Sequence, residues 1–208
     1  MKTILVLSDT HGSASAFTRV AAKNPGADAL IFLGDGCKDL EKVQEQLPMP
    51  VYPVHGNCDF GALEPGEGLV AFEGVLFYYV HGHQYNVKCG YEDLARNAIC
   101  RGADVALFGH SHCPALVQLG KVTLFNPGSA ALPRTGRPTY GRITVEQGKA
   151  LNQELKHNLD EKLHSKDRKA EKKDVSSILN DLSAEDLREL KRKLDGIDLD
   201  DDITDDPE

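Results

Sequence analysis

Short apolar runs recur along the first three quarters of the chain. They are rich in Val, Ile, Leu and Phe and alternate little with polar residues, which is the pattern of strands covered on both faces. We therefore predict five buried strands, at residues 3–7, 29–33, 51–54, 75–80 and 105–108.

Helical and hairpin patterns separate or follow these runs. Helical spacing is found in residues 13–24, 38–47 and 91–102. At the end of the last segment, Gly102 fits a helix C-terminal cap. Residues 115–126 and 140–155 each predict two short strands joined at a glycine turn. Together these patterns predict an α/β domain with an antiparallel portion.

The composition changes near residue 155, because glycine and proline are frequent before it and scarce after it. We predict a main domain at 1–155 and a charged helical extension at 156–208. Within the extension, apolar spacing at 175–182 and 187–194 indicates two short amphipathic helices, and the acidic end is expected to be disordered. The helices could pack on the domain, on a protein partner or on a second copy.

The chain of 208 residues has a formal net charge of -8. This charge disfavours a broad nucleic-acid surface, because phosphate backbones are repelled, but it leaves room for a small phosphoester substrate beside a bound cation. Five scattered cysteines without a C-x-x-C pair indicate a reducing compartment. The start has too short an apolar run for a signal peptide or a membrane span, so we expect a cytoplasmic protein.

Side chains that bind metals follow all five predicted strands. Because the carboxyl ends of strands in an open α/β sheet converge on one crevice, these side chains are expected to meet there. Taken singly, each motif has an ordinary interpretation as a turn aspartate, a surface histidine or a Gly-Asn turn. The set consists of Asp9, His11, Asp35, Asn57, His81, His83, His110 and His112.

Carboxylate, imidazole and amide ligands suit Mn²⁺, Fe²⁺, Zn²⁺ or Ni²⁺. Seven such ligands exceed the needs of one four-coordinate zinc ion, but they would serve two ions that share a carboxylate. Two ions roughly 3.5–4 Å apart are the usual arrangement for phosphoryl displacement, where they lower the pKa of a bridging water and hold the phosphate oxygens.

The ordered motifs "SDTHG", "LGDG", "GNCD", "HGH" and "GHSH" resemble those of the calcineurin-like metallophosphoesterases, and most of all the small YfcE-type bacterial and archaeal phosphodiesterases. The resemblance spans roughly residues 1–155 and includes "NPGS" at 126–129. It implies a four-layer αββα sandwich with a dinuclear site on one edge, and hydrolysis of phosphoesters by a metal-bridging hydroxide, often with manganese. It also implies the ligands: Asp9, His11 and His112 for one ion, Asp35 as the bridge, and Asn57, His81 and His110 for the other.

The same resemblance implies that Asp35, Asn57 and His81 act in catalysis through the metal centre. Independently of the resemblance, position and charge make Asn57, His83 and Arg134 the residues expected to contact the substrate.

Cys58 stands where many larger members of the family have a histidine that is thought to protonate the leaving group. A thiol of ordinary pKa is a weak acid at pH 7. We therefore expect a preference for phosphodiesters with acidic leaving groups. Cys58 itself is expected to be neither nucleophile nor primary metal ligand, but a small buried cysteine beside the site.

Several nearby residues keep two interpretations each. His83 could contact a substrate phosphate or stay on the rim. Asp59 could orient a ligand histidine or cap a turn. Arg134 and Arg137 could bring positive charge to the substrate, although most arginines in such loops are solvated. Asn126 is expected to tie loops together near the site.

Two other functions remain open at this stage. The first is a phosphomonoesterase or an enzyme for one cyclic nucleotide. The second is a non-catalytic scaffold, a use known from the retromer subunit that resembles this family. The complete set of seven ligands favours an enzyme.

Overall fold

The computed structural model describes residues 1–147 and 149–157, which belong to one compact unit, Met1–Leu159. The domain boundary near residue 155 stays a prediction. The two helices and the acidic end expected between residues 175 and 208 lie outside the described residues. Within the described part, no helix is long and apolar enough to cross a membrane.

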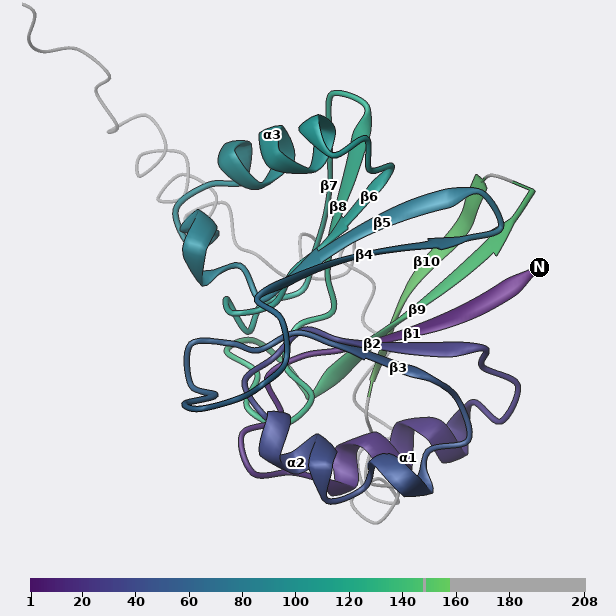
Figure 1. Cartoon of the computed structure of the whole chain (residues 1–208), viewed down its shortest axis with the longest axis vertical. Helices are drawn as coiled ribbons and strands as arrows, with labels where there is room; N and C mark the ends of the chain where they lie inside the picture. The colour runs from purple at the N-terminus through teal and green to yellow at the C-terminus, as the bar shows by residue number, and fades with distance from the viewer. Residues whose placement is uncertain (148, 158–208) are drawn as a thin grey trace, which may run out of the picture. The chain divides into compact units, whose positions relative to one another are not determined.

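Sheet A has five strands, β1 (Lys2–Leu7), β2 (Ala29–Phe32), β3 (Val51–Pro53), β9 (Thr139–Glu146) and β10 (Lys149–His157). Their order is β10-β9-β1-β2-β3 (Figure 1). Strands β1, β2 and β3 are parallel, whereas β9 is antiparallel to both β1 and β10. The parallel trio therefore delivers the segments after β1, β2 and β3 to the same edge of the sheet.

Sheet B also has five strands, β4 (Glu67–Phe72), β5 (Val75–Val80), β6 (Val105–Leu107), β7 (Ala115–Leu119) and β8 (Val122–Asn126). Their order is β4-β5-β6-β8-β7. Strands β5, β6 and β8 are parallel, and the hairpin partners β4 and β7 run antiparallel at the two edges.

Alternate residues of β1 face two different cores, as the two-residue period of a strand requires. Ile4 and Val6 lie in the core between the sheets with Phe77 of β5. Leu5 and Leu7 face the opposite way, toward Phe17. The predicted α/β fold, with two mixed sheets that pack face to face, is confirmed.

Helices cover the outer faces of both sheets (Figure 1). Apolar residues of α1 and α2 pack on sheet A, and those of α3 pack on sheet B. The helix α3 stops where expected, because Gly102 has a φ of 75° and its N–H donates to the carbonyl of Ile99. The helical segments are α1 (Ser15–Lys23), α2 (Cys37–Glu41), the 3₁₀ turns Gln44–Gln46 and His83–Tyr85, and α3 (Glu92–Cys100).

Two details differ from the sequence prediction. Strand β4 was missed, because it is an edge strand whose residues are alternately exposed and half-buried, and it carries Gly68 within it. Strand β3 was expected to be covered on both faces, but it is an edge strand of half-buried residues and ends at Pro53. Proline suits that position, because an edge strand can lack one ladder hydrogen bond.

Candidate metal centre

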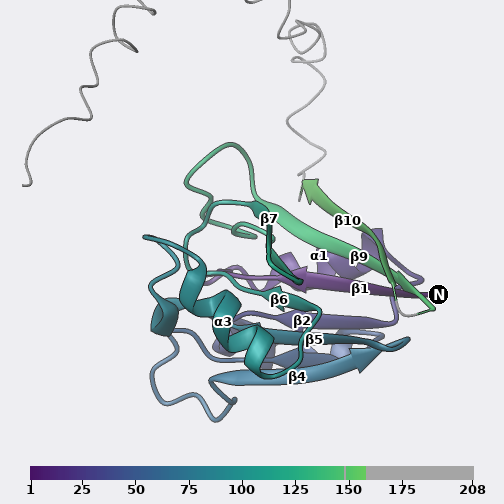
Figure 2. The ribbon, with the colours of Figure 1, turned by 90° about the horizontal axis from the view of Figure 1, so that it is seen from above.

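The seven predicted ligands follow β1, β2 and β3 of sheet A and β5 and β6 of sheet B. Figures 1 and 2 show the loops after these strands at the same edge of the two sheets, opposite the N-terminus. Side-chain contacts link all seven into one cluster. The nitrogen and oxygen atoms approach at 3.2 Å for His11–His112, His112–Asp9, His81–Asn57 and His81–His110, at 3.4 Å for His81–Asp35 and at 3.8 Å for His11–Asp35.

Asp9, His11 and His112 form one half of this cluster. Their ligand atoms lie within 4.8 Å of one another, close enough to surround one ion. The Asp9 side chain is fully buried, and its Oδ1 atom has no hydrogen-bond partner. A buried carboxylate oxygen without a partner is costly, so this half of the cluster fits a bound cation.

Asp35 lies between the two halves. Its Oδ2 atom is 3.8 Å from His11 Nε2 and 3.4 Å from His81 Nε2. Asp9, Asp35 and His81 form a second group whose atoms lie within 4.8 Å of one another. Asn57 Oδ1 and His110 Nδ1 each lie 3.2 Å from the same Nε2 atom of His81 and complete the second half. The arrangement suits a carboxylate shared by two ions.

Backbone carbonyls fix the orientation of two imidazoles. His81 Nδ1 lies 2.7 Å from the carbonyl oxygen of Leu33, and His112 Nδ1 lies 2.6 Å from that of Leu132. Because a carbonyl can only accept, each neutral ring must carry its proton on Nδ1. Nε2 then presents a lone pair to the cluster, as metal-binding histidines do when an outer partner holds the other nitrogen.

This assignment also explains the contact between His112 and Asp9. The Nε2 atom of His112 and Oδ1 of Asp9 lie 3.2 Å apart. Interaction with Asp9 raises the pKa of His112, and in the protonated ring the Nε2 hydrogen lies between these two atoms. A divalent cation can take the place of that proton, because the neutral ring and the carboxylate then each offer it a lone pair, so the ligands present fit the implied metal.

Backbone conformation marks the same residues. Eight described residues other than glycine have a positive φ, and five of them are predicted ligands. A positive φ is unfavourable for side chains other than glycine and persists only where the surroundings enforce it, often at functional sites. The five are Asp9, His11, Asp35, His110 and His112.

The charges of the cluster are consistent with ligation. Burial acts to raise the pKa of Asp35, but the hydrogen bond and charge of His81 and the Cys58 N–H hold that pKa far below its usual value. Burial and the nearby positive charges of His81 and Lys88 lower the pKa of His110 to about 4. The ionised Asp35 and the neutral His110 are already in the forms that bind metal. Burial acts to lower the pKa of His81, but the hydrogen bond with Asp35 and the charge of Asp9 raise it, so a metal that binds at Nε2 would displace a proton from this ring.

Asp59 caps turns, which was one of its two predicted interpretations. Its carboxylate accepts backbone N–H groups of Asp35, Gly36, Cys37 and Gly56 at 2.7–2.9 Å. Burial would raise its pKa, but these donors outweigh burial and lower it. Asp59 thus joins the loop after β2 to the loop after β3.

Residues 126–129 tie the remaining loops together. The amide of Asn126 donates to the Gly109 carbonyl at 2.9 Å and to Ser111 Oγ at 3.0 Å. Ser129 Oγ donates to the Asp9 carbonyl at 2.8 Å. The expected loop-tying role of Asn126 is therefore confirmed by its contacts.

The prediction that Cys58 is buried is wrong. Cys58 is exposed, because it lies on a turn whose neighbours Asn57 and Phe60 are exposed too. Its Sγ atom groups with ligand atoms of His11 and Asp35 within 4.8 Å. Although the residue as a whole is exposed, partial burial of the thiol, followed by the hydrogen bond and charge of Asp35, raises its pKa to about 11.

The residues expected to contact substrate lie around the cluster. The His83 ring centroid is 5.5 Å from that of His81, and its buried Nδ1 atom has no hydrogen-bond partner. Arg134 is exposed, and its backbone N–H donates to the His112 carbonyl at 3.2 Å. Arg137 is half-buried in the same loop. The roles of all three residues stay predictions.

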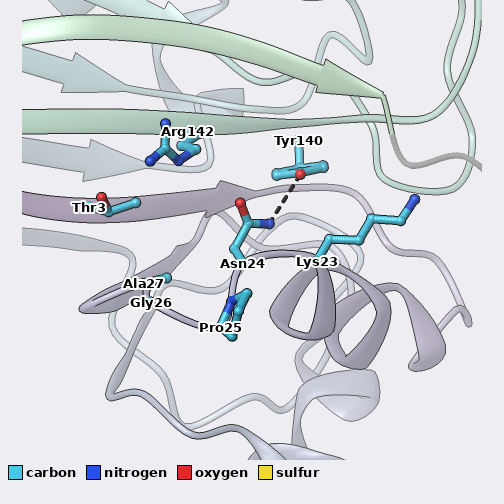
Figure 3. A pocket seen from close by; sticks show the side chains of 8 residues that line it. All are labelled: Thr3, Lys23, Asn24, Pro25, Gly26, Ala27, Tyr140 and Arg142. Atoms are coloured by element: carbon cyan, nitrogen blue, oxygen red, sulfur yellow. Dashed lines mark hydrogen bonds between the residues drawn. The ribbon is translucent and has the colours of Figure 1, made fainter.

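A hollow of about 460 Å³ lies away from the predicted ligands. It runs beside β1, from Thr3 near the amino end past the end of α1 to Tyr140 on β9 (Figure 3). Its lining includes Thr3, Lys23, Asn24, Tyr140 and Arg142. None of the predicted ligands lines it.

Similarity to known proteins was found at three levels. The family description "Calcineurin-like phosphoesterase superfamily domain" matches residues 1–148. "Probable metallophosphoesterase YsnB" of Bacillus subtilis is 33% identical over 149 residues, which cover 71% of this chain and 86% of that protein. "Phosphodiesterase YfcE" of Escherichia coli is 32% identical over 169 residues, which cover 69% of this chain and 88% of that protein.

A solved structure agrees with these relatives. The crystal structure of a predicted phosphoesterase from Streptococcus pneumoniae superposes with a TM-score of 0.64 at 25% identity and covers 76% of this chain and 90% of that one. The family match spans more than half of the chain and includes all seven predicted ligands. The chain therefore belongs to the calcineurin-like phosphoesterase superfamily, among relatives of the YsnB and YfcE type.

Proposed function

We propose that this metallophosphoesterase hydrolyses phosphodiesters with two divalent metal ions, which are Mn²⁺ in its active form. The observation that carries the proposal is the convergence of seven ligands on one cluster, in which Asp9 Oδ1 and Asp35 Oδ2 each lie within 3.9 Å of two imidazole nitrogens. A fold that serves only as a scaffold would have no need to keep all seven ligands together. Asp9, His11 and His112 would hold one ion, Asn57, His81 and His110 the other, and Asp35 both.

When bound, two such ions lower the pKa of a water molecule and polarise the phosphoryl oxygens. The chain supplies the geometry for this chemistry. The carbonyls of Leu33 and Leu132 hold the rings of His81 and His112, and Asp59 holds the backbone on either side of Asp35. Preorganised ligands avoid rearrangement during the reaction.

The substrate is expected to be a small phosphoester. Around the cluster, the unpartnered Nδ1 atom of His83 offers a polar contact to a substrate phosphate. The guanidinium of Arg134, on a loop attached to His112, adds positive charge on the same side. Asn57 would contact both metal and substrate. Phosphomonoester hydrolysis is the alternative activity that the test below separates.

Cys58 explains the proposed preference for acidic leaving groups. Its pKa of about 11 keeps the thiol protonated at neutral pH. So weak an acid gives little general-acid assistance to a departing alkoxide. A nitrophenolate leaves without such help. Cys58→Ser should therefore change the rate on bis-p-nitrophenyl phosphate little, and Cys58→His should improve hydrolysis of alkyl diesters more than that of aryl diesters. A loss of metal binding in Cys58→Ser would contradict the assignment.

The deciding experiment compares bis- and mono-p-nitrophenyl phosphate with Mn²⁺, Zn²⁺, Ni²⁺ or no added metal. We expect metal-dependent turnover with a preference for the diester, and loss of both activities in Asp35→Asn. A preference for the monoester would make the chain a phosphomonoesterase. Absence of turnover with every metal would leave a scaffold, whose partner could bind the segment beyond residue 157. A cytoplasmic location is part of the same proposal and is tested by fractionation.

A further inference from the structure

A third buried aspartate, besides Asp9 and Asp35, lies next to the cluster but outside the predicted ligand set. Asp39, on α2, is 3% exposed. Its Oδ2 atom accepts two hydrogen bonds, from Thr10 Oγ1 at 2.8 Å and from the Gly12 N–H at 2.7 Å. Its other oxygen is 3.5 Å from the exposed Lys42 ammonium. No sequence pattern indicates this role, because a lone aspartate in a short helix usually faces solvent.

Both bonds reach the loop that carries two predicted ligands. Thr10 lies between Asp9 and His11, whose φ angles are 55° and 39°, and Gly12 follows with a φ of 94°. Three of the four residues from Asp9 to Gly12 thus have a positive φ. Such a segment keeps one conformation only if its polar groups are held from outside.

Other contacts hold the loop at its start, and Asp39 holds it at its end. The backbone N–H groups of Asp9 and His11 donate to the carbonyls of Gly34 and Asp35 at 3.0 and 3.1 Å. Without Asp39, the buried hydroxyl of Thr10 and the N–H of Gly12 would lose their acceptor. An unpaired buried donor costs about 1–3 kcal/mol, which favours rearrangement of the loop.

We propose that Asp39 is a positioning residue that sets the metal affinity of one half of the centre, the half built from Asp9, His11 and His112. The half-buried Asp59 has a broader role, because its four N–H donors lie in the loop of the shared ligand Asp35 and next to Asn57. This inference rests on the proposed function, since it needs two ions to bind.

The test is a calorimetric titration of the metal-free full chain with Mn²⁺. Wild-type protein should show two binding events. Asp39→Ala should weaken one event by roughly 10- to 100-fold, the usual cost of losing an outer partner of a ligand, and change the other by less than about threefold. Asp59→Ala should weaken both events, because it releases the loop of the shared ligand Asp35. Thr10→Val, which removes only the hydroxyl, should reproduce part of the Asp39→Ala effect.

Two controls separate positioning from general destabilisation. Asp39→Asn can keep a single oxygen toward Thr10 and Gly12, so it should retain most of the affinity that Asp39→Ala loses. Lys42→Ala removes only the surface contact and should bind both ions as wild-type does. If Asp39→Ala does not fold, Thr10→Val and Asp39→Asn carry the comparison.

Each outcome has a definite meaning. Equal affinities in wild-type, Asp39→Ala and Thr10→Val would overturn the inference but leave the proposed function intact. Equal weakening of both events, with a matching fall in Tm, would reduce Asp39 to a structural residue and would also overturn it. Failure of the wild-type chain to bind Mn²⁺ would remove the proposed function and this inference together.

Discussion

The two ends of β1 are both polar, but they differ in how their polar groups are satisfied. At the amino end, Asp28 accepts hydrogen bonds from the Thr3 N–H at 2.8 Å and from the Lys2 ammonium at 2.9 Å. At the carboxyl end, the buried Asp9 Oδ1 has no hydrogen-bond partner and lies 3.2 Å from His112 Nε2. The described hollow begins near the amino end, at Thr3, and its side chains already bind one another, because the Asn24 amide donates to the Tyr140 hydroxyl at 3.1 Å (Figure 3).

This difference shows that the candidate chemistry lies where coordination is incomplete, not in the described hollow. The carboxyl end concentrates charge, buried lone pairs and positive φ angles in one place, and each of these is unfavourable unless a cation is bound. The amino end shows the ordinary case of polar groups that pair at a surface. Substitutions matched between the two ends test whether the contrast is functional.

The largest difference is expected in activity. Asp9→Asn removes a charged ligand and should lower the rate on bis-p-nitrophenyl phosphate by more than the roughly 100-fold that loss of an outer partner costs. Tyr140→Phe, an equally conservative change in the hollow of Figure 3, removes only a hydroxyl and should change the rate by less than about twofold. Initial rates at saturating Mn²⁺ measure both, and comparable losses in the two variants would refute the contrast.

Backbone packing should show the next largest difference. Gly34 has a φ of 90°, and an added Cβ would come 2.8 Å from the His55 carbonyl carbon, which cannot rotate away. Gly34→Ala should therefore lower the free energy of unfolding by at least about 2 kcal/mol. Gly26 lines the amino-end hollow with open space around it, and Gly26→Ala should stay within about 0.5 kcal/mol of wild-type.

Urea unfolding of the two alanine variants without metal gives this comparison directly. Metal must be absent, because a change in metal affinity would otherwise add to the packing effect. Equal stability of the two variants would mean that the loop after β2 tolerates expansion, contrary to the close approach of Gly34 to the loop after β3.

Metal removal should lower the Tm only in proteins that keep the ligands at the carboxyl end. Binding of an ion to the folded state alone stabilises it by about 2.7 kcal/mol at 100 times the dissociation constant. Chelation should therefore lower the Tm of wild-type and of Tyr140→Phe. In Asp9→Asn the chelator should have a smaller effect, and its metal-free form should be at least as stable as the metal-free wild-type, since a buried unpaired carboxylate has been removed. Thermal melts with and without EDTA check both statements.

The residues at the carboxyl ends of the strands are also the ones that the sequence predicted best. The donors Asp9, Asp35, Asn57, His81 and His110 were found because each follows a buried apolar strand, and the parallel order of the strands brings them together. Local pattern was sufficient there, because hydrophobic runs define the strands and strand direction defines the edge. Their assignment as ligands stays a prediction, although their side chains do meet.

What the sequence did not reveal depends on contacts between distant segments. The role of Asp39 needs the fold, because its partners Thr10 and Gly12 are 27 or more positions away. Strand β4 was missed because its exposed edge lacks a continuous apolar run. The exposure of Cys58 was mispredicted because cysteine is usually buried, whereas a tight turn after Asn57 leaves it at the surface.

The smallest expected effect is a pH dependence at the amino end. The hydrogen bond from Lys2, followed by the Thr3 N–H, lowers the pKa of Asp28 below its ordinary value. A carboxyl whose pKa is lower in the folded than in the unfolded state contributes stability above the unfolded value, and this contribution disappears as the pH falls through the folded value. Asp28→Asn should therefore be less stable than wild-type at pH 7, by less than the Gly34→Ala difference, and the gap should close below about pH 4.

This last comparison tests whether polar residues at the amino end affect stability alone or activity as well. The contact of Lys2 with Asp28 at 2.9 Å is partly exposed, so salt should screen it, and the pH 7 gap should narrow in 1 M NaCl. Activity at neutral pH should not change in Asp28→Asn, because a satisfied surface pair needs no cation and contributes none of the ligands. A fall in Mn²⁺-dependent rate in this variant, at unchanged Tm, would mean that the two ends of β1 are coupled.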